Sequence, residues 1–280
     1  MSCAWKELLS ILPASMRVEV DRLGKDSLQE IRMRIGYPPM LICALRDIEL
    51  SMIIQAQDLL FVINTASRYS PWLAGTLARG YITAPGGHRI GVCGEAVVKD
   101  DRMTGIRNPT SLCVRVARDF PGMVREKCMI SGSVLIIGQP GSGKTTFLRD
   151  LIRLRSSHSV GGVAVVDERG EIFPIAAGFA SGQKTDVITG CSKKEGLEAV
   201  LRTMGPETIA VDEITSETDC QSLLYAAWCG VSLIATAHAA SKHDLMSRPV
   251  YRPLLHAKIF DKLVVLQKDK SWAIERMDYL

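Results

Sequence analysis

The stretch SVLIIGQPGSGKTTFLRDLIRL, residues 133–154, decides the fold of the second half of this chain. Its central octapeptide, Gly138 to Thr145, fits the pattern G-x-x-x-x-G-K-[ST] at every fixed position. An apolar run typical of a strand precedes the octapeptide, and an amphipathic run typical of a helix follows it. Strand, glycine-rich loop and helix in this order indicate a loop that wraps nucleotide phosphates.

The residue types in this loop explain how it would hold phosphate groups. Glycines let the backbone curl so that successive N–H groups point into one concavity, and the following helix adds the positive end of its dipole. We expect Lys144 to neutralise β- and γ-phosphate charge and the Thr145 hydroxyl to hold Mg²⁺. The predicted ligand is ATP with Mg²⁺, and the expected binding residues are Gly138, Gln139, Pro140, Gly141, Ser142, Gly143, Lys144, Thr145 and Thr146.

Beyond the loop, apolar strands alternate with helical stretches as far as residue 238. This alternation predicts crossover connections and a parallel sheet covered on both faces. The last segments, 261–268 and 271–279, are predicted to form a terminal hairpin or edge pair. The expected strands cover 133–138, 163–168, 184–189, 208–213 and 231–238, and the expected helices cover 144–154, 194–204 and 218–228.

The N-terminal half has a different, mixed pattern. We expect helices at 4–12, 13–23 and 58–70, and strands at 30–35, 40–45, 81–84, 88–98 and 111–117. Pro85-Gly86-Gly87 and Asn108-Pro109 are predicted turns. The pattern changes near 122–132, so we predict an α+β domain over residues 1–124, for docking and oligomerisation, and a nucleotide-binding domain over 125–280.

Hydrolysis requires a carboxylate near the metal and a second one to orient the attacking water. The strand TIAVDE would deliver Asp212 toward Mg²⁺ and Glu213 toward that water, at the carboxyl end of the sheet. The alternative is a strand that merely ends in solvated acids. A second acidic cluster, Asp167-Glu168-Arg169-Gly170-Glu171, follows another strand and would reach the same edge.

The remaining candidates would sense or neutralise the γ-phosphate. Thr236 and His238 end a strand beside the predicted site, although His238 could equally be a capping or internally satisfied histidine. Arg202, before the strand of Asp212, is the first candidate for an arginine that completes the site, because phosphoryl transfer needs positive charge at its transition state. Arg248 and Arg252 are the other two, and each of the three could instead be a surface or carboxylate-paired residue.

Composition excludes several classes. The 280 residues are 47% hydrophobic and carry a net charge of +4, so a buried core is expected and a strongly basic nucleic-acid face is not. No apolar run approaches the roughly 18 residues of a membrane span. The eight cysteines contain no C-x-x-C and mostly lie in apolar strings, which predicts reduced core residues of a cytosolic protein.

The order of phosphate loop, acidic box, arginine, acidic strand and histidine box resembles the type II and type IV secretion and pilus ATPases of the RecA-like class. The segments GQPGSGKTTFLRDLIR, VAVVDERGEI, LRTMGPETIAVDEI, GVSLIATAHA and YITAPGGHRIGVCGEAVV are similar to the stage III sporulation protein AA family. The resemblance covers nearly the whole chain. It implies a RecA-like P-loop core of α/β class, preceded by a smaller α+β domain.

Within this resemblance, Glu171 matches the position of the catalytic glutamate of secretion ATPases, and Glu213 matches a glutamate that acts through the metal. Those enzymes usually have Gly-Glu where this chain has Asp212-Glu213, the form in which the glutamate orients water in AAA-type ATPases. Two glutamates therefore compete for one role. The family also implies a cytoplasmic ATPase, peripheral at a membrane through a protein partner of a sporulation channel complex, and a ring, expected to be a hexamer.

The alternative is an AAA-type ATPase that depends on single-stranded nucleic acid. The R-x-x-x-H spacing of Arg252 and His256 is the one feature in its favour. Few aromatic residues are available to stack on bases, so a nucleic-acid partner is not expected. A nucleotide-gated switch with negligible turnover is a third reading, which two candidate glutamates disfavour.

Overall fold

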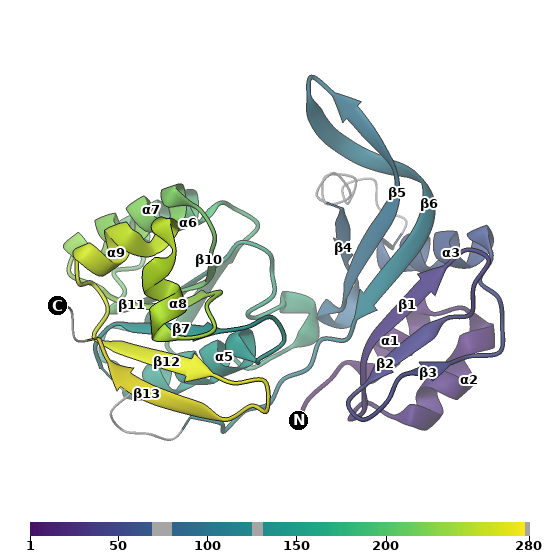
Figure 1. The fold of residues 1–280 in the computed structure, drawn as a ribbon, viewed down its shortest axis with the longest axis horizontal. Helices are drawn as coiled ribbons and strands as arrows, with labels where there is room; N and C mark the ends of the chain where they lie inside the picture. Colours follow the sequence, from purple (N-terminus) through teal and green to yellow (C-terminus); the bar gives the residue numbers. More distant parts are fainter. Residues whose placement is uncertain (69–79, 125–130, 278–280) are drawn as a thin grey trace. The chain divides into compact units, whose positions relative to one another are not determined.

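The computed structural model describes residues 1–68, 80–124 and 131–277, which belong to two compact units (Figure 1). Unit 1 comprises Met1–Asp119 together with the short segment Pro174–Phe179. Unit 2 comprises Phe120–Phe173 and Ala180–Leu280. The assignment of separate roles to 1–124 and 125–280 stays a prediction.

Unit 2 is built on a seven-stranded sheet in the order β13-β12-β7-β11-β10-β8-β9. All neighbouring strands run parallel except β12 and β13, which form the antiparallel pair expected at the C-terminal end. The predicted α/β class with a mostly parallel sheet is therefore confirmed. The strands are β7 (Val134–Gly138), β8 (Val163–Asp167), β9 (Thr185–Thr189), β10 (Thr208–Ile214), β11 (Ser232–Ala237), β12 (Lys262–Leu266) and β13 (Trp272–Arg276).

Helices cover both faces of this sheet (Figure 1). Because side chains alternate along a strand, Leu135 and Ile137 of β7 face one core, which they share with Leu197 and Leu223 of two helices on that face. One helix contacts the sheet from the opposite side and buries Phe147. The helices are α5 (Lys144–His158), on the face that buries Phe147, and α6 (Lys193–Thr203), α7 (Glu217–Trp228), α8 (Lys242–Ser247) and α9 (Arg252–His256), on the opposite face.

Unit 1 is the predicted α+β module. Its six strands are antiparallel and follow the order β3-β2-β1-β6-β5-β4. Residues of three helices and of the sheet share one buried core, which is separate from that of unit 2. The elements are α1 (Trp5–Ile11), α2 (Ala14–Leu23), α3 (Ala56–Ala66), β1 (Leu28–Arg34), β2 (Met40–Cys43), β3 (Ile48–Glu49), β4 (Tyr81–Thr83), β5 (Arg89–Lys99) and β6 (Arg102–Arg115). Residues 69 and 70, expected in the third helix, lie outside the described residues.

The predicted turn at Asn108-Pro109 is wrong. Both residues lie inside β6, and the β5–β6 hairpin turns instead at Asp100 and Asp101, whose φ values are 51° and 57°. The strand register shifts between Cys93 and Glu95, opposite Asn108, so the chain forms a bulge there. A bulge tolerates the missing N–H of a proline, which explains why Pro109 does not end the strand. The two long strands extend beyond the rest of the sheet of unit 1 (Figure 1).

The predicted turn at Pro85-Gly86-Gly87 is present as a short 3₁₀ helix. It is buried against other parts of unit 1 and does not form an exposed surface. A Cβ built on Gly87 would lie 2.6 Å from the Cβ of Pro174 and 2.9 Å from the Cβ of Ala177. The segment Pro174–Phe179 therefore packs directly on this turn.

The expectation that the cysteines are core residues is mostly wrong. Among the seven cysteines within the described ranges, only Cys220 is buried. Burial raises the pKa of its thiol to about 11. No helix in the described part of the chain combines the length and apolarity that a membrane span requires.

Candidate nucleotide-binding site

The phosphate loop connects β7, which is buried along its whole length, to the first turn of α5. Two glycines of the loop adopt left-handed backbone angles, with φ of 75° at Gly141 and 101° at Gly143, which glycine adopts without strain. Gly138 is required for space, since a Cβ there would lie 2.9 Å from the carbonyl oxygen of Leu266. The structure thus forms the glycine-dependent loop that the sequence predicts.

Lys144 begins α5 and is largely buried, with 8% exposure. Its Nζ donates to the carbonyl oxygens of Gly138 at 2.9 Å and Gln139 at 3.2 Å, and lies 3.1 Å from Nδ1 of His238. Burial lowers the pKa of Lys144, while the charges of Asp212 and Glu213 oppose this effect. The ammonium is therefore held within the loop, where a phosphate would accept its protons in place of the carbonyls.

A hydroxyl and a carboxylate meet beside the lysine. Thr145 donates from Oγ1 to Oδ2 of Asp212 at 2.9 Å. Oδ1 of the same carboxylate accepts a short hydrogen bond from the Thr236 hydroxyl. Hydroxyl and carboxylate oxygens beside a phosphate loop are the ligands that Mg²⁺ takes in nucleotide sites, so this pair fits the predicted metal.

Glu213 follows Asp212 and has a left-handed backbone conformation, with φ of 46°. Its N–H donates to Thr236 Oγ1 at 2.8 Å and to Asp212 Oδ1 at 3.0 Å, which holds this conformation. One carboxylate oxygen, Oε1, lies 2.7 Å from Nε2 of His238. Because Lys144 has only protons to offer, His238 Nδ1 accepts and Nε2 carries the proton that bonds Glu213.

The second acidic cluster forms a loop after β8. Asp167 is almost fully buried and accepts backbone N–H bonds from Glu171, Ile172 and Phe173 at 2.8, 2.8 and 3.0 Å. Burial raises the pKa of the Asp167 carboxyl to about 6, against the lowering effect of the Phe173 and Ile172 N–H groups. Asp167 therefore anchors the loop by fixing its backbone.

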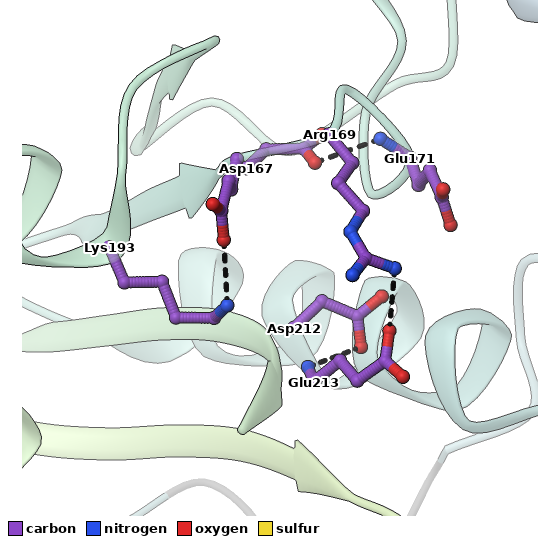
Figure 2. Close-up of a pocket in the computed structure, with 7 residues that line it drawn as sticks. Asp167, Arg169, Glu171, Lys193, Asp212 and Glu213 are labelled. Carbon is purple, nitrogen blue, oxygen red and sulfur yellow. Dashed lines mark hydrogen bonds and ion pairs between the residues drawn. The ribbon is translucent and has the colours of Figure 1, made fainter. Parts of the chain in front are cut away.

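Glu171 lines the same small pocket as Asp212 and Glu213. Its carbonyl oxygen accepts a hydrogen bond from Arg149 of α5 at 3.1 Å. In Figure 2 Glu171 follows Arg169 on the acidic loop. The pocket is lined by Asp167, Glu168, Arg169, Glu171, Lys193, Asp212 and Glu213.

Three basic residues at the site were not expected from the sequence. Arg169 reaches from the acidic loop to Glu213, with Nη1 2.9 Å from Oε2 (Figure 2). Lys193, at the start of α6, is buried and pairs with Glu168 at 2.8 Å and with Asp219 at 3.6 Å. Lys270, in the β12–β13 turn, donates a short hydrogen bond to the Gly141 carbonyl. Of the three, Arg169 could have been suspected from the sequence, because it lies within the acidic box DERGE.

The arginines proposed from sequence do not join this cluster within one chain. Arg202 is exposed in the last turn of α6, which leads into the amino end of β10, whereas Asp212 and Glu213 lie near its carboxyl end. Arg248 pairs with Asp244 at 3.0 Å, and Arg252 begins the short helix α9 and is exposed. Thr146, in the first turn of α5, is half-buried.

A parallel sheet with a glycine-rich phosphate loop and acidic residues at its carboxyl edge defines the class of P-loop ATPase folds. Two solved structures share this fold. The Legionella pneumophila ATPase DotB has a TM-score of 0.61 at 17% identity, covering 95% of this chain and 80% of that chain. The pilus retraction motor PilT with bound ADP has a TM-score of 0.63 at 16% identity, covering 91% and 78% respectively.

The particular family is shown by sequence. Residues 4–276 match the family model described as sporulation stage III, protein AA, and the chain belongs to this family. Stage III sporulation protein AA of Bacillus subtilis is 36% identical over 281 residues, which covers 95% of this chain and 92% of that protein. The resemblance drawn from the sequence motifs is confirmed.

Proposed function

We propose that this chain is an ATPase that binds Mg-ATP at residues 138–146 and hydrolyses it as a motor of the secretion-ATPase type. One observation carries the proposal: Lys144, Thr145, Asp212, Glu213 and His238 converge at the carboxyl edge of the unit 2 sheet within direct hydrogen-bonding distance of one another. Together these residues supply a counter-charge for phosphate, two oxygen ligands for a metal and a candidate base. Phosphoryl transfer needs these groups at one place.

Each residue has a role in this proposal. Thr145 and Asp212 hold Mg²⁺, which when bound would neutralise phosphate charge. Lys144 exchanges its carbonyl partners for phosphate oxygens. Glu213 orients the attacking water, a role that its contact with His238 supports, and His238 senses the γ-phosphate through its contacts with both Lys144 and Glu213. Glu171 is the second candidate for the base.

The biological setting follows from relatives. The family is named for sporulation stage III, and the two neighbours with the same fold are described as an ATPase and as a retraction motor with ADP bound. We propose that the chain works in spore formation as a ring, a hexamer, in the cytoplasm at a membrane channel complex that a protein partner provides. Arg202, exposed and remote from its own site, would complete the site of a neighbouring subunit.

The test is nucleotide binding and hydrolysis by the purified full chain, with and without Mg²⁺ and with and without single-stranded DNA or RNA. We expect Mg-dependent ATP hydrolysis that nucleic acid does not stimulate. Stimulation that falls steeply with salt would favour the nucleic-acid-dependent ATPase instead. Binding without any turnover would contradict the proposed hydrolysis and support a nucleotide-gated switch.

A further inference from the structure

Arg169 has no place in the proposed reaction, yet its side chain contacts the candidate base directly. Arg169 Nη1 lies 2.9 Å from Glu213 Oε2, while His238 Nε2 lies 2.7 Å from the other oxygen, Oε1. Both oxygens of Glu213 are thus engaged by protein groups, and Figure 2 shows the contact with Arg169. The carboxylate is therefore held between two elements, the acidic loop and the end of β11.

The position of Arg169 is set by a buried anchor. Asp167, two residues earlier, fixes the loop through three backbone N–H groups, and Gly170 follows with φ of 66°, a left-handed angle that suits a sharp turn. On the far side of the loop, Glu168 pairs with the buried Lys193. The backbone at Arg169 is therefore held while its long side chain stays 46% exposed and free to change rotamer.

The contact between Arg169 and Glu213 is one that a phosphate could displace. A half-exposed ion pair is weak because water screens it and both side chains lose freedom in forming it. A phosphate group carries more charge than a carboxylate and matches the planar fork of a guanidinium with two parallel hydrogen bonds. The terminal phosphate of a bound triphosphate would therefore compete successfully for Arg169.

We infer that Arg169 is a positioning residue that exchanges partners: it holds Glu213 while the site is empty and turns to the γ-phosphate when a triphosphate is bound. This exchange frees Oε2 of Glu213 to face water only when the substrate is present. The site would thereby distinguish ATP from ADP through the acidic loop. The inference rests on the proposed function, since it needs a nucleotide at residues 138–146.

The experiment measures the affinity of the full chain for Mg-ADP and for a non-hydrolysable ATP analogue with Mg²⁺, in wild type and Arg169→Gln. Losing the charge-assisted contact between Arg169 and the terminal phosphate should weaken binding of the analogue about tenfold or more. Affinity for ADP, which has no γ-phosphate, should stay within about twofold of wild type. Arg169→Lys keeps the charge without the planar fork, so its affinity for the analogue should lie between those of wild type and Arg169→Gln.

A double-mutant cycle tests the exchange itself. In the Glu213→Gln background Arg169 no longer has to leave a charged partner. Arg169→Gln should therefore reduce the affinity for the analogue by a factor about threefold larger in that background than in wild type. Arg107→Gln is the matched control, because Arg107 makes the same type of exposed pair with Glu95 at 2.8 Å in unit 1. The control should change neither affinity. Equal costs of Arg169→Gln in both backgrounds would overturn the exchange.

The outcomes separate this inference from the proposed function. One outcome is that both nucleotides bind, that Lys144→Ala abolishes this binding, and that Arg169→Gln lowers the affinities for ADP and for the analogue equally. In that case the partner exchange is wrong and the ATPase proposal stands. If wild type binds neither nucleotide, both proposals fail. Unchanged thermal unfolding of nucleotide-free Arg169→Gln would support the inference, since a merely structural role predicts a lower midpoint.

Discussion

At the scale of single residues, buried polar side chains decide how loops are held. His88 is fully buried, with Nε2 2.9 Å from the Ala4 carbonyl oxygen and Nδ1 accepting the Ala117 N–H at 3.1 Å. Nε2 must therefore carry the proton, and the ring is a neutral donor and acceptor at once. Burial lowers the pKa of His88 below its ordinary 6.5, although the Ala4 carbonyl opposes this shift.

This geometry predicts a pH dependence of unit 1. Because the folded pKa lies below the unfolded one, the unfolded chain binds the proton more tightly, and stability is lost as pH falls below about 6.5. Denaturant unfolding of wild type at pH 7.5 and 5.5 should show this loss. His88→Gln should cost about 1–3 kcal/mol at pH 7.5 and be less sensitive to pH over this range. Equal pH sensitivity in the two proteins would contradict the assignment.

The two competing glutamates give a second residue-scale prediction. Glu213→Gln should retain ATP binding and lose turnover by roughly 10²-fold or more, because the base contributes about that factor. Glu171→Gln should lose less, because Glu213 and not Glu171 contacts His238, which lies against Lys144. Single-turnover hydrolysis measures both. A larger loss in Glu171→Gln than in Glu213→Gln would exchange the two roles.

Residue types that form motifs could be predicted here, and residues held by tertiary contacts could not. The loop around Lys144 and the strand end at Asp212 follow from local pattern. The partners of Asp167 are backbone N–H groups of its own loop, and the pairing of Arg169 with Glu213 depends on two strands lying side by side. No local sequence pattern predicts which of several acidic side chains will pair with which basic side chain.

At the scale of elements, close packing of α6 on β8 depends on one glycine. A Cβ at Gly196 would collide with the side chain of Val166 and lie 3.0 Å from Cys191 Sγ. Gly196→Ala should therefore lower the free energy of unfolding of unit 2 by about 1–3 kcal/mol, as overpacking does. Gly105→Ala is the control, since nothing lies within 4 Å of a Cβ there. Denaturant unfolding that shows equal stability for both variants would contradict this packing.

Helices and strands could be predicted where the hydrophobic periodicity was strong, whereas the positions of turns were harder to predict. The strands of unit 2 are continuous apolar runs, and their parallel order follows from the intervening helices. The dipeptide Asn108-Pro109 misled because the same residues that make turns also make bulges, and only cross-strand register distinguishes them. The hairpin turns at Asp100-Asp101, which carry no glycine or proline signal.

At the scale of the whole molecule, the chain does not divide at a single point. Pro174–Phe179 belongs to unit 1, although it follows the acidic loop of unit 2 directly in sequence. Its packing depends on the bare backbone of Gly87. Composition gives no sign of this return to the first unit, because the segment is apolar in either setting.

The proposed ring predicts complementation between subunits. A mixture of Arg202→Ala and Lys144→Ala chains should recover part of the hydrolysis that each lacks alone, because the first keeps the phosphate loop and the second keeps the arginine. Specific activity of wild type should also rise with protein concentration as rings assemble. A strict monomer with concentration-independent activity would contradict the shared site, and full activity of Arg202→Ala would transfer the role to Arg248 or Arg252.

The most direct test of the central claim is ATP hydrolysis and ATP binding by Lys144→Ala beside wild type. Lys99→Ala, which changes an exposed lysine of the β5–β6 hairpin, is the matched control. Loss of the phosphate counter-charge should weaken ATP binding by roughly 10²-fold or more and abolish measurable turnover, while Lys99→Ala behaves as wild type. Hydrolysis by Lys144→Ala at the wild-type rate would contradict the assignment of the site.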